Sequence, residues 1–95
     1  MAAIHKLAKW ERVRQRAMRR DEYLCQECKR FGKSTEAREV HHRMPVETAP
    51  ELAFTAWNLI SLCHKCHNAM HVRATHELTE LGNYWAERVS PRPNE

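Results

Sequence analysis

Apolar residues recur at three- and four-residue steps near the start of the chain, and basic side chains fill the positions between them. This spacing predicts an amphipathic helix over residues 5–20, because side chains three and four positions apart share one helical face. The apolar stripe consists of Leu7, Trp10, Val13, Ala17 and Met18. Such a stripe is normally the buried side of a helix, so we expect Leu7 and Trp10 in the core.

The middle of the chain changes from a helical period to an alternating one. Residues 21–37 are polar and irregular, with Gly32 as a turn signal. Residues 38–46 alternate between apolar and polar positions and predict a short strand that Pro45 ends. After a loop with one or two helical turns, residues 57–62 predict a second strand.

The last third of the chain returns to a helical pattern. It predicts one helix over residues 64–74 and a final helix over residues 76–88, with Thr75 as its N-cap. The inner face of the final helix would carry Leu78, Leu81, Tyr84, Trp85 and Val89. Residues 90–95 are expected to be a frayed tail. Helices around two short strands predict an α+β fold.

Length and composition fit one small domain over residues 1–95. Hydrophobic residues make up 42% and charged residues 29%, which excludes a disordered chain and an integral membrane protein. No apolar run approaches the roughly 20 residues of a membrane span, and no signal peptide is recognisable. We therefore expect a cytoplasmic protein in a reducing compartment. A chain this short often needs a cross-link, such as a structural metal ion, in addition to its apolar core.

The four cysteines can supply that cross-link, because they form two pairs with the same spacing. Cys25 and Cys28 make one Cys-x-x-Cys turn, and Cys63 and Cys66 make the other. Two such turns supply the tetrahedral sulfur ligands of a structural zinc ion. The pairs are farther apart than in a compact zinc ribbon, so the fold must bring them together. A redox dithiol would explain one pair but not two.

Positive charge is concentrated at the N-terminus. The formal net charge is +4, yet residues 1–20 hold seven basic side chains against one acidic side chain. Such a block is typical of a phosphate-binding surface, although a solvated helix face is an alternative. The candidates for DNA contacts on one helical face are Arg12, Arg16, Arg19 and Arg20.

The chain contains seven histidines, and four of them have informative spacing. His41 and His42 are neighbours on the first predicted strand, so their rings should point to opposite faces and have different tasks. His67 and His71 lie four apart on a predicted helix, which favours two nitrogens on one ion. The remaining histidines, expected in surface or packing positions, are His5, His64 and His76.

The order of these motifs resembles the HNH endonucleases, or ββα-metal nucleases. The matching strings are EVHHRMP at residues 39–45, NLISLC at 58–63 and CHN at 66–68. Upstream, RRDEYLCQEC at residues 19–28 resembles the zinc-knuckle members common in phages and prophages. The resemblance covers roughly residues 10–72. It implies a ββα-metal core, an antiparallel hairpin followed by a helix, with a four-cysteine zinc knuckle and flanking helices.

The resemblance also implies roles for individual residues. His41 and His67 resemble the metal ligands of the family, and His42 resembles its general base. Asn58 resembles the residue that holds the loop between the two strands. By likeness to the colicin-type nucleases, His71 is a further ligand and Glu39 a carboxylate that supports a ligand.

The ligand chemistry leaves the identity of the catalytic ion open. A site of neutral imidazoles favours Ni, Co, Zn or Mn over Mg, which prefers oxygen ligands. The family resemblance, by contrast, implies Mg or Mn.

Together these features predict a metal-dependent DNA endonuclease that hydrolyses phosphodiester bonds with a His general base and one divalent ion. A basic helix would occupy residues 1–24, the knuckle and core residues 25–75, and a helix with a tail residues 76–95. The expected partner is DNA, without a membrane. By resemblance alone, phage packaging proteins and a bacterial or phage-infected cell are implied. The alternative is a non-catalytic, zinc-stabilised DNA-binding module, which leaves the histidine pattern unexplained.

Overall fold

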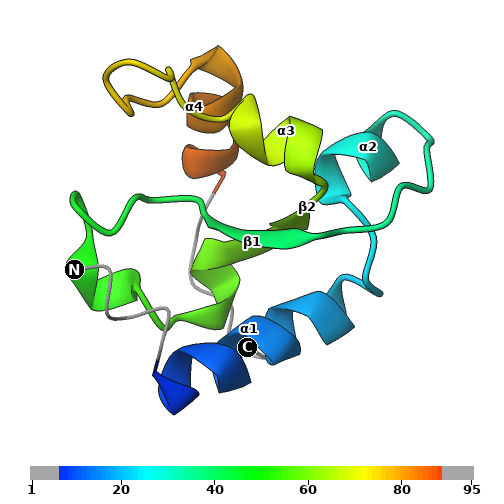
Figure 1. Cartoon of the computed structure of the whole chain (residues 1–95), viewed down its shortest axis with the longest axis horizontal. Coiled ribbons are helices and arrows are strands. Elements are labelled where there is room, and N and C mark those ends of the chain that lie inside the picture. Colours follow the sequence, from blue (N-terminus) through cyan, green and yellow to red (C-terminus); the bar gives the residue numbers. More distant parts are fainter. Residues whose placement is uncertain (1–6, 89–95) are drawn as a thin grey trace.

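The computed structural model describes residues 7–88, which form four helices around a two-stranded antiparallel hairpin (Figure 1). The helices are α1 (Ala8–Arg20), α2 (Gln26–Arg30), α3 (His64–Asn68) and α4 (Glu80–Ala86). The strands are β1 (Glu39–His42) and β2 (Leu59–Leu62), and short 3-10 turns span Pro50–Leu52 and Ala56–Asn58. The predicted α+β class is confirmed, and β1, β2 and α3 form the ββα core. None of the described helices is long and apolar enough to cross a bilayer.

The hairpin has two faces, and each carries different chemistry. In its register, His41 pairs with Ile60 and His42 pairs with Leu59. Directly paired residues point to the same face of a sheet, and successive residues alternate between faces. Figure 1 shows α1 on one side of the hairpin, with α2 and α3 on the other. The alternation therefore directs His41 and His42 to opposite faces, as the sequence predicts.

Each face of the hairpin packs against its own small core. The first cluster of buried residues consists of Cys25, Ile60, Leu62 and Met70, with Leu81 and Trp85 of α4 and the remaining cysteines packed against it. The second cluster consists of Trp10, Ala17 and Leu59, with Val13, Val40 and Phe54 packed against it. Neither cluster is large, so the fold has no single dominant apolar core.

Helix α1 forms as the periodicity predicts, and most of its apolar stripe is buried. Trp10 is only 5% exposed, and Ala17 and Met18 are also buried. The prediction for Leu7 is wrong, because that side chain is 47% exposed. Leu7 occupies the N-cap position, before the first helical turn, so it lies outside the packed part of the stripe. The two residues that precede it in the predicted helix lie outside the described residues.

The polar stretch over residues 21–37 is not wholly irregular, because it contains α2. This short helix begins after Cys25, whose Sγ accepts a hydrogen bond from the Cys28 N–H at 3.4 Å. The cysteine thereby acts as an N-cap, a role that polar side chains usually fill. Gly32 lies in the turn that follows, with φ +79°, a conformation that favours glycine.

The helix boundaries after the hairpin also differ from those predicted. Helix α3 ends at Asn68 instead of Ala74, and α4 begins after Thr79 instead of Thr75. The Thr79 hydroxyl accepts a hydrogen bond from the Gly82 N–H at 3.1 Å and donates one to the Ala69 carbonyl at 2.6 Å. These two bonds fix Thr79 as the cap and tie α4 to the end of α3. Val89 and the predicted tail lie outside the described residues.

Gly82 permits the close approach of α4 to the core. An added Cβ would lie 2.3 Å from the Met70 carbonyl oxygen and 2.8 Å from Leu78 Cδ2. We expect Gly82→Ala to lower the free energy of unfolding by about 1–3 kcal/mol, because a backbone atom must move to relieve the clash. Asn83→Ala, on the exposed side of the same helix, should change it by less than about 0.5 kcal/mol. Chemical denaturation of both variants measures this difference, and equal losses would contradict the packing argument.

Candidate metal centres and active site

The four cysteines converge at the N-termini of α2 and α3. Their Sγ atoms all lie within 4.8 Å of one another, with Cys28 3.8 Å from Cys66 and 4.0 Å from Cys63. A tetrahedral zinc ion with Zn–S bonds of about 2.3 Å requires sulfur atoms about 3.8 Å apart. The sulfur positions therefore fit one zinc ion.

Burial opposes the ionisation of some of these thiols. Burial raises the pKa of the Cys25 and Cys66 thiols. Burial also raises the pKa of Cys63, but hydrogen bonds from the Cys66 amide and the neighbouring thiols outweigh this effect and bring the pKa to about 7. Four thiolates this close together would repel one another. Full ionisation of the set requires a metal ion, which deprotonates its coordinating thiols.

A buried polar contact joins the knuckle to α4, and sequence reasoning missed it. Glu27, between the first two cysteines, accepts a hydrogen bond from Trp85 Nε1 at 2.9 Å. Arg30 pairs with the same carboxylate, at 3.0 Å through Nε and 3.2 Å through Nη2. Since Trp85 also packs against the cysteine cluster, α4 covers the knuckle. Pairing between residues this far apart in sequence leaves no local signal.

His41 lies at the centre of a histidine cluster on the α3 face of the hairpin. Its ring centroid lies 5.3 Å from that of His67 and 5.4 Å from that of His71. The side chain is 2% exposed, and its Nε2 atom is buried without a hydrogen-bond partner. Burial, with contributions from the two neighbouring histidines, lowers the pKa of His41 to about 3. A neutral imidazole nitrogen that is buried without a partner fits a metal ligand.

Glu39 supports the cluster from the start of β1. Its carboxylate contacts Nδ1 of His67 and Nδ1 of His64, the latter at 2.6 Å. Burial raises the pKa of Glu39, but the hydrogen bonds from His64 and His67 outweigh it and hold the pKa below its usual range. When Nδ1 of His67 donates to a carboxylate, Nε2 keeps the lone pair for a metal. His64 faces solvent, as expected, yet its contact with Glu39 was not predicted.

His71 also lies in this cluster, but it is not on the helix predicted to carry it. Because α3 ends at Asn68, His71 does not share a helical face with His67. It lies instead in an isolated bridge with Leu78. Burial lowers its pKa, so this third imidazole is also held neutral. The histidines are gathered less tightly than the cysteines, which are the only metal-type group found among the described residues with all donor atoms within 4.8 Å.

His42 projects from the opposite face of β1, toward α1. Its Nε2 atom lies 2.9 Å from the Ala53 carbonyl oxygen, and its ring stacks on Trp10 with centroids 5.1 Å apart. A carbonyl oxygen can only accept a hydrogen bond, so Nε2 carries the proton. In the neutral ring, the basic lone pair therefore lies on Nδ1.

Asn58 fastens the two ends of the loop between the strands. It is fully buried, and its Oδ1 accepts a hydrogen bond from the Met44 N–H at 2.9 Å. Its Nδ2 group donates to the carbonyls of Met44 at 3.2 Å and Leu52 at 3.3 Å. Leu52 precedes Ala53, whose carbonyl contacts His42. Asn58 thus fixes the loop segment that holds the His42 ring.

Three of the four candidate arginines share one exposed surface of α1. Arg12, Arg16 and Arg19 line a single hollow there. Arg20 is also exposed, but its guanidinium binds both oxygens of Asp21 at 2.9 Å and the Leu59 carbonyl at 2.6 Å. It joins α1 to β2 and does not line this hollow.

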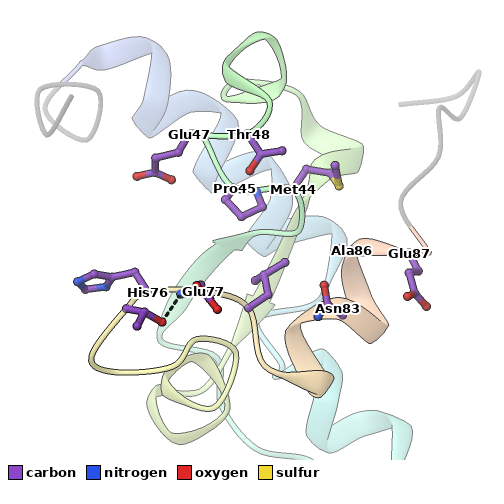
Figure 2. Close-up of a pocket in the computed structure, with 11 residues that line it drawn as sticks. Met44, Pro45, Glu47, Thr48, His76, Glu77, Asn83, Ala86 and Glu87 are labelled. Carbon is purple, nitrogen blue, oxygen red and sulfur yellow. Dashed lines mark hydrogen bonds between the residues drawn. The ribbon is translucent and has the colours of Figure 1, made fainter.

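A larger hollow lies between the loop after β1 and α4 (Figure 2). Its apolar lining includes Met44, Pro45, Leu78 and Ala86. Three carboxylates, those of Glu47, Glu77 and Glu87, also line it. None of the predicted site residues does so. Carboxylates repel phosphate, so this hollow is not a candidate for DNA contacts.

Comparisons with known proteins agree with this geometry. The family model for HNH endonucleases matches residues 25–73, which include both cysteine pairs and the histidine cluster. Among solved structures, the chain is similar to the HNH endonuclease of the deep-sea thermophilic bacteriophage GVE2, a crystal structure with manganese ion. The two chains are 37% identical, with a TM-score of 0.68 over 70% of this chain and 73% of that one. Among curated proteins, no significant match is found.

The cysteine geometry predicts that zinc is part of the folded structure. We expect Cys63→Ser to lose tightly bound zinc and most of its helical signal, because closed thiolate sites contribute on the order of 10 kcal/mol to folding. Lys65→Ser, at an exposed position in the same turn, should keep one equivalent of zinc. Metal analysis and circular dichroism measure both properties. A Cys63→Ser protein with one zinc ion and unchanged thermal stability would contradict a structural role.

Proposed function

Because this chain belongs to the HNH endonuclease family, we propose that it is a metal-dependent DNA endonuclease that hydrolyses phosphodiester bonds with one divalent ion and His42 as general base. One observation carries the proposal: His41 has a buried Nε2 atom without a hydrogen-bond partner, beside two further imidazoles. On the other face of the same strand, His42 is oriented with its lone pair on Nδ1. The two faces thus separate ion binding from proton transfer.

His41, His67 and His71 are the residues that would hold the catalytic ion. Bound there, a divalent ion would supply positive charge to the scissile phosphate and to the leaving 3′ oxygen. Because His41 and His71 are neutral, each ring has a nitrogen lone pair that can bind the ion. Imidazole donors favour Mn, Co, Ni or Zn over Mg. Glu39 orients His67 by accepting its Nδ1 proton.

His42 would remove a proton from the attacking water through Nδ1. A neutral imidazole with a basic lone pair can accept a proton from water. The Ala53 carbonyl fixes the required tautomer, and its oxygen also stabilises the positive charge that the ring acquires. Asn58 contributes by holding the backbone of this segment. It thereby keeps in place the Ala53 carbonyl, which accepts the hydrogen bond from Nε2 of His42.

The exposed arginines of α1 would bind the DNA backbone. Arg12, Arg16 and Arg19 lie on the same helix as Trp10, which contacts the general base. Phosphate contacts of this kind position a protein on DNA without reading its sequence. The carboxylate-lined hollow between the loop after β1 and α4 would face away from the phosphates.

A plasmid-nicking assay with a panel of divalent ions tests the proposal. Cleavage that requires an added ion, and that is lost on chelation, supports an endonuclease. DNA binding without cleavage under any of Mg, Mn, Co, Ni and Zn would favour the non-catalytic, zinc-stabilised module.

The proposal assigns different consequences to the two active-site faces. We expect His42→Ala to keep both metal sites and DNA binding but to cleave at least about a hundred-fold more slowly, because the general base is lost. His67→Ala should weaken the binding of the divalent ion itself, because a ligand is removed. Calorimetric titration of the ion and single-turnover cleavage measure the two effects.

His76→Asn serves as the matched control for both substitutions. His76 is exposed, and asparagine tolerates its positive φ of 64°. This variant should keep the wild-type affinity for the ion and the wild-type rate. If His42→Ala lost the ion while His67→Ala retained it, the assignment of roles would be reversed.

The arginine surface predicts the salt dependence of DNA binding. We expect the double variant of Arg12→Gln and Arg16→Gln to lower the slope of log K against log salt by about 1–2, since each phosphate contact contributes about 0.9. A control that changes the exposed Lys33 and Arg38 to Gln should alter the slope less. Fluorescence anisotropy at several salt concentrations gives both slopes. Equal slopes for wild type and the α1 variant would place the DNA elsewhere.

A further inference from the structure

The ring of His42 is held by a residue outside the recognised motifs. Trp10 stacks on it with an interplanar angle of 23° and centroids 5.1 Å apart. The contact joins α1 to β1, between residues that are far apart in the sequence. Trp10 is 5% exposed and belongs to the buried cluster with Ala17 and Leu59. Its indole is therefore a fixed surface.

The surroundings of His42 leave its ring few orientations. The Cα atom is fixed by pairing with Leu59 in the hairpin, and Leu59 packs in the same cluster as Trp10. The Ala53 carbonyl fixes one edge of the ring through Nε2. The hydrogen bond at Nε2 holds the ring at one atom, about which the ring plane can still tilt. A flat indole against one face restricts that tilt, because the stacked arrangement keeps the two planes nearly parallel.

We propose that Trp10 is a positioning residue for the general base, and that it keeps Nδ1 of His42 directed at the attacking water. This inference rests on the proposed function of His42. It gives α1 a second task beside its phosphate contacts. Because Arg12 and Arg16 follow Trp10 on the same helix, binding of the DNA backbone and alignment of the base depend on one rigid element.

The expected effect on the rate follows from the strength of the contact. Aromatic pairs contribute up to about 1.5 kcal/mol beyond burial, which corresponds to roughly ten-fold in rate. We expect Trp10→Leu, which keeps an apolar side chain but loses the flat face, to lower kcat about ten-fold. KM and the affinity for the divalent ion should stay within about two-fold, since neither depends on the orientation of the His42 ring. Trp10→Phe should recover most of the rate.

Two comparisons separate positioning from a general loss of packing. Val13→Ala removes a side chain from the same cluster one helical turn away and should leave kcat within about two-fold. In the His42→Ala background, Trp10→Leu should have no further effect on kcat, because the group through which it acts is absent. A loss of stability alone would reduce the rate equally in both backgrounds.

Nuclear magnetic resonance of the zinc-loaded protein gives a readout independent of activity. The wild type should show nuclear Overhauser contacts between the Trp10 and His42 rings, and Trp10→Leu should shift the His42 ring protons downfield as the indole ring current is lost. If Trp10→Leu does not fold, the rate of Trp10→Phe and the ring contacts in the wild-type spectrum test the positioning role. Absent ring contacts, or the same ten-fold loss in the His42→Ala background, would overturn the positioning role. Full activity of His42→Ala would instead overturn the proposed function.

Discussion

The structure depends on four cysteine sulfurs that must meet at one point. Two short turns, far apart in the chain, supply them from the N-termini of α2 and α3. Neither apolar cluster is large enough to replace this constraint, because each has only three or four fully buried residues. The consequence for function lies in the next residue. His67 directly follows Cys66 in α3, so the cysteine cluster that fixes the helix also places His67 in the histidine cluster.

The two-residue period of β1 gives the second constraint. Neighbouring side chains on a strand cannot share a face, so adjacent His41 and His42 meet different surroundings. On the α3 face, burial among imidazoles keeps His41 neutral, with a nitrogen that lacks a protein partner. On the α1 face, a carbonyl and an indole hold His42. The hairpin therefore separates the proposed metal site from the proposed proton acceptor by the thickness of one strand.

The sequence predicted the features that arise from local patterns. The cysteine spacing identified the cluster of four sulfur atoms, and the alternation of β1 separated the two histidines. Prediction from the sequence failed where tertiary contacts determine the structure. Leu7 fits the helical period, yet it precedes the first turn of α1 and stays exposed. The end of α3 depends on Thr79, which caps the next helix while it binds Ala69, and no local pattern reports that pair. Arg20 fits the basic face by spacing, and its contacts with Asp21 and the β2 backbone are not visible in that pattern. The stacking of Trp10 on His42 is likewise invisible in a pattern, because helical period alone explains a buried tryptophan.

The central claim is that one strand separates two chemical sites, with the ion on the α3 face and the base on the α1 face. Anomalous diffraction from crystals soaked in manganese tests it most directly. We expect a zinc signal among the four cysteine sulfurs and a separate manganese signal in contact with His41 and His67. His42 should lie outside bonding distance of both ions. A manganese signal bound to His42, or none at the histidine cluster while zinc is present, would contradict the account.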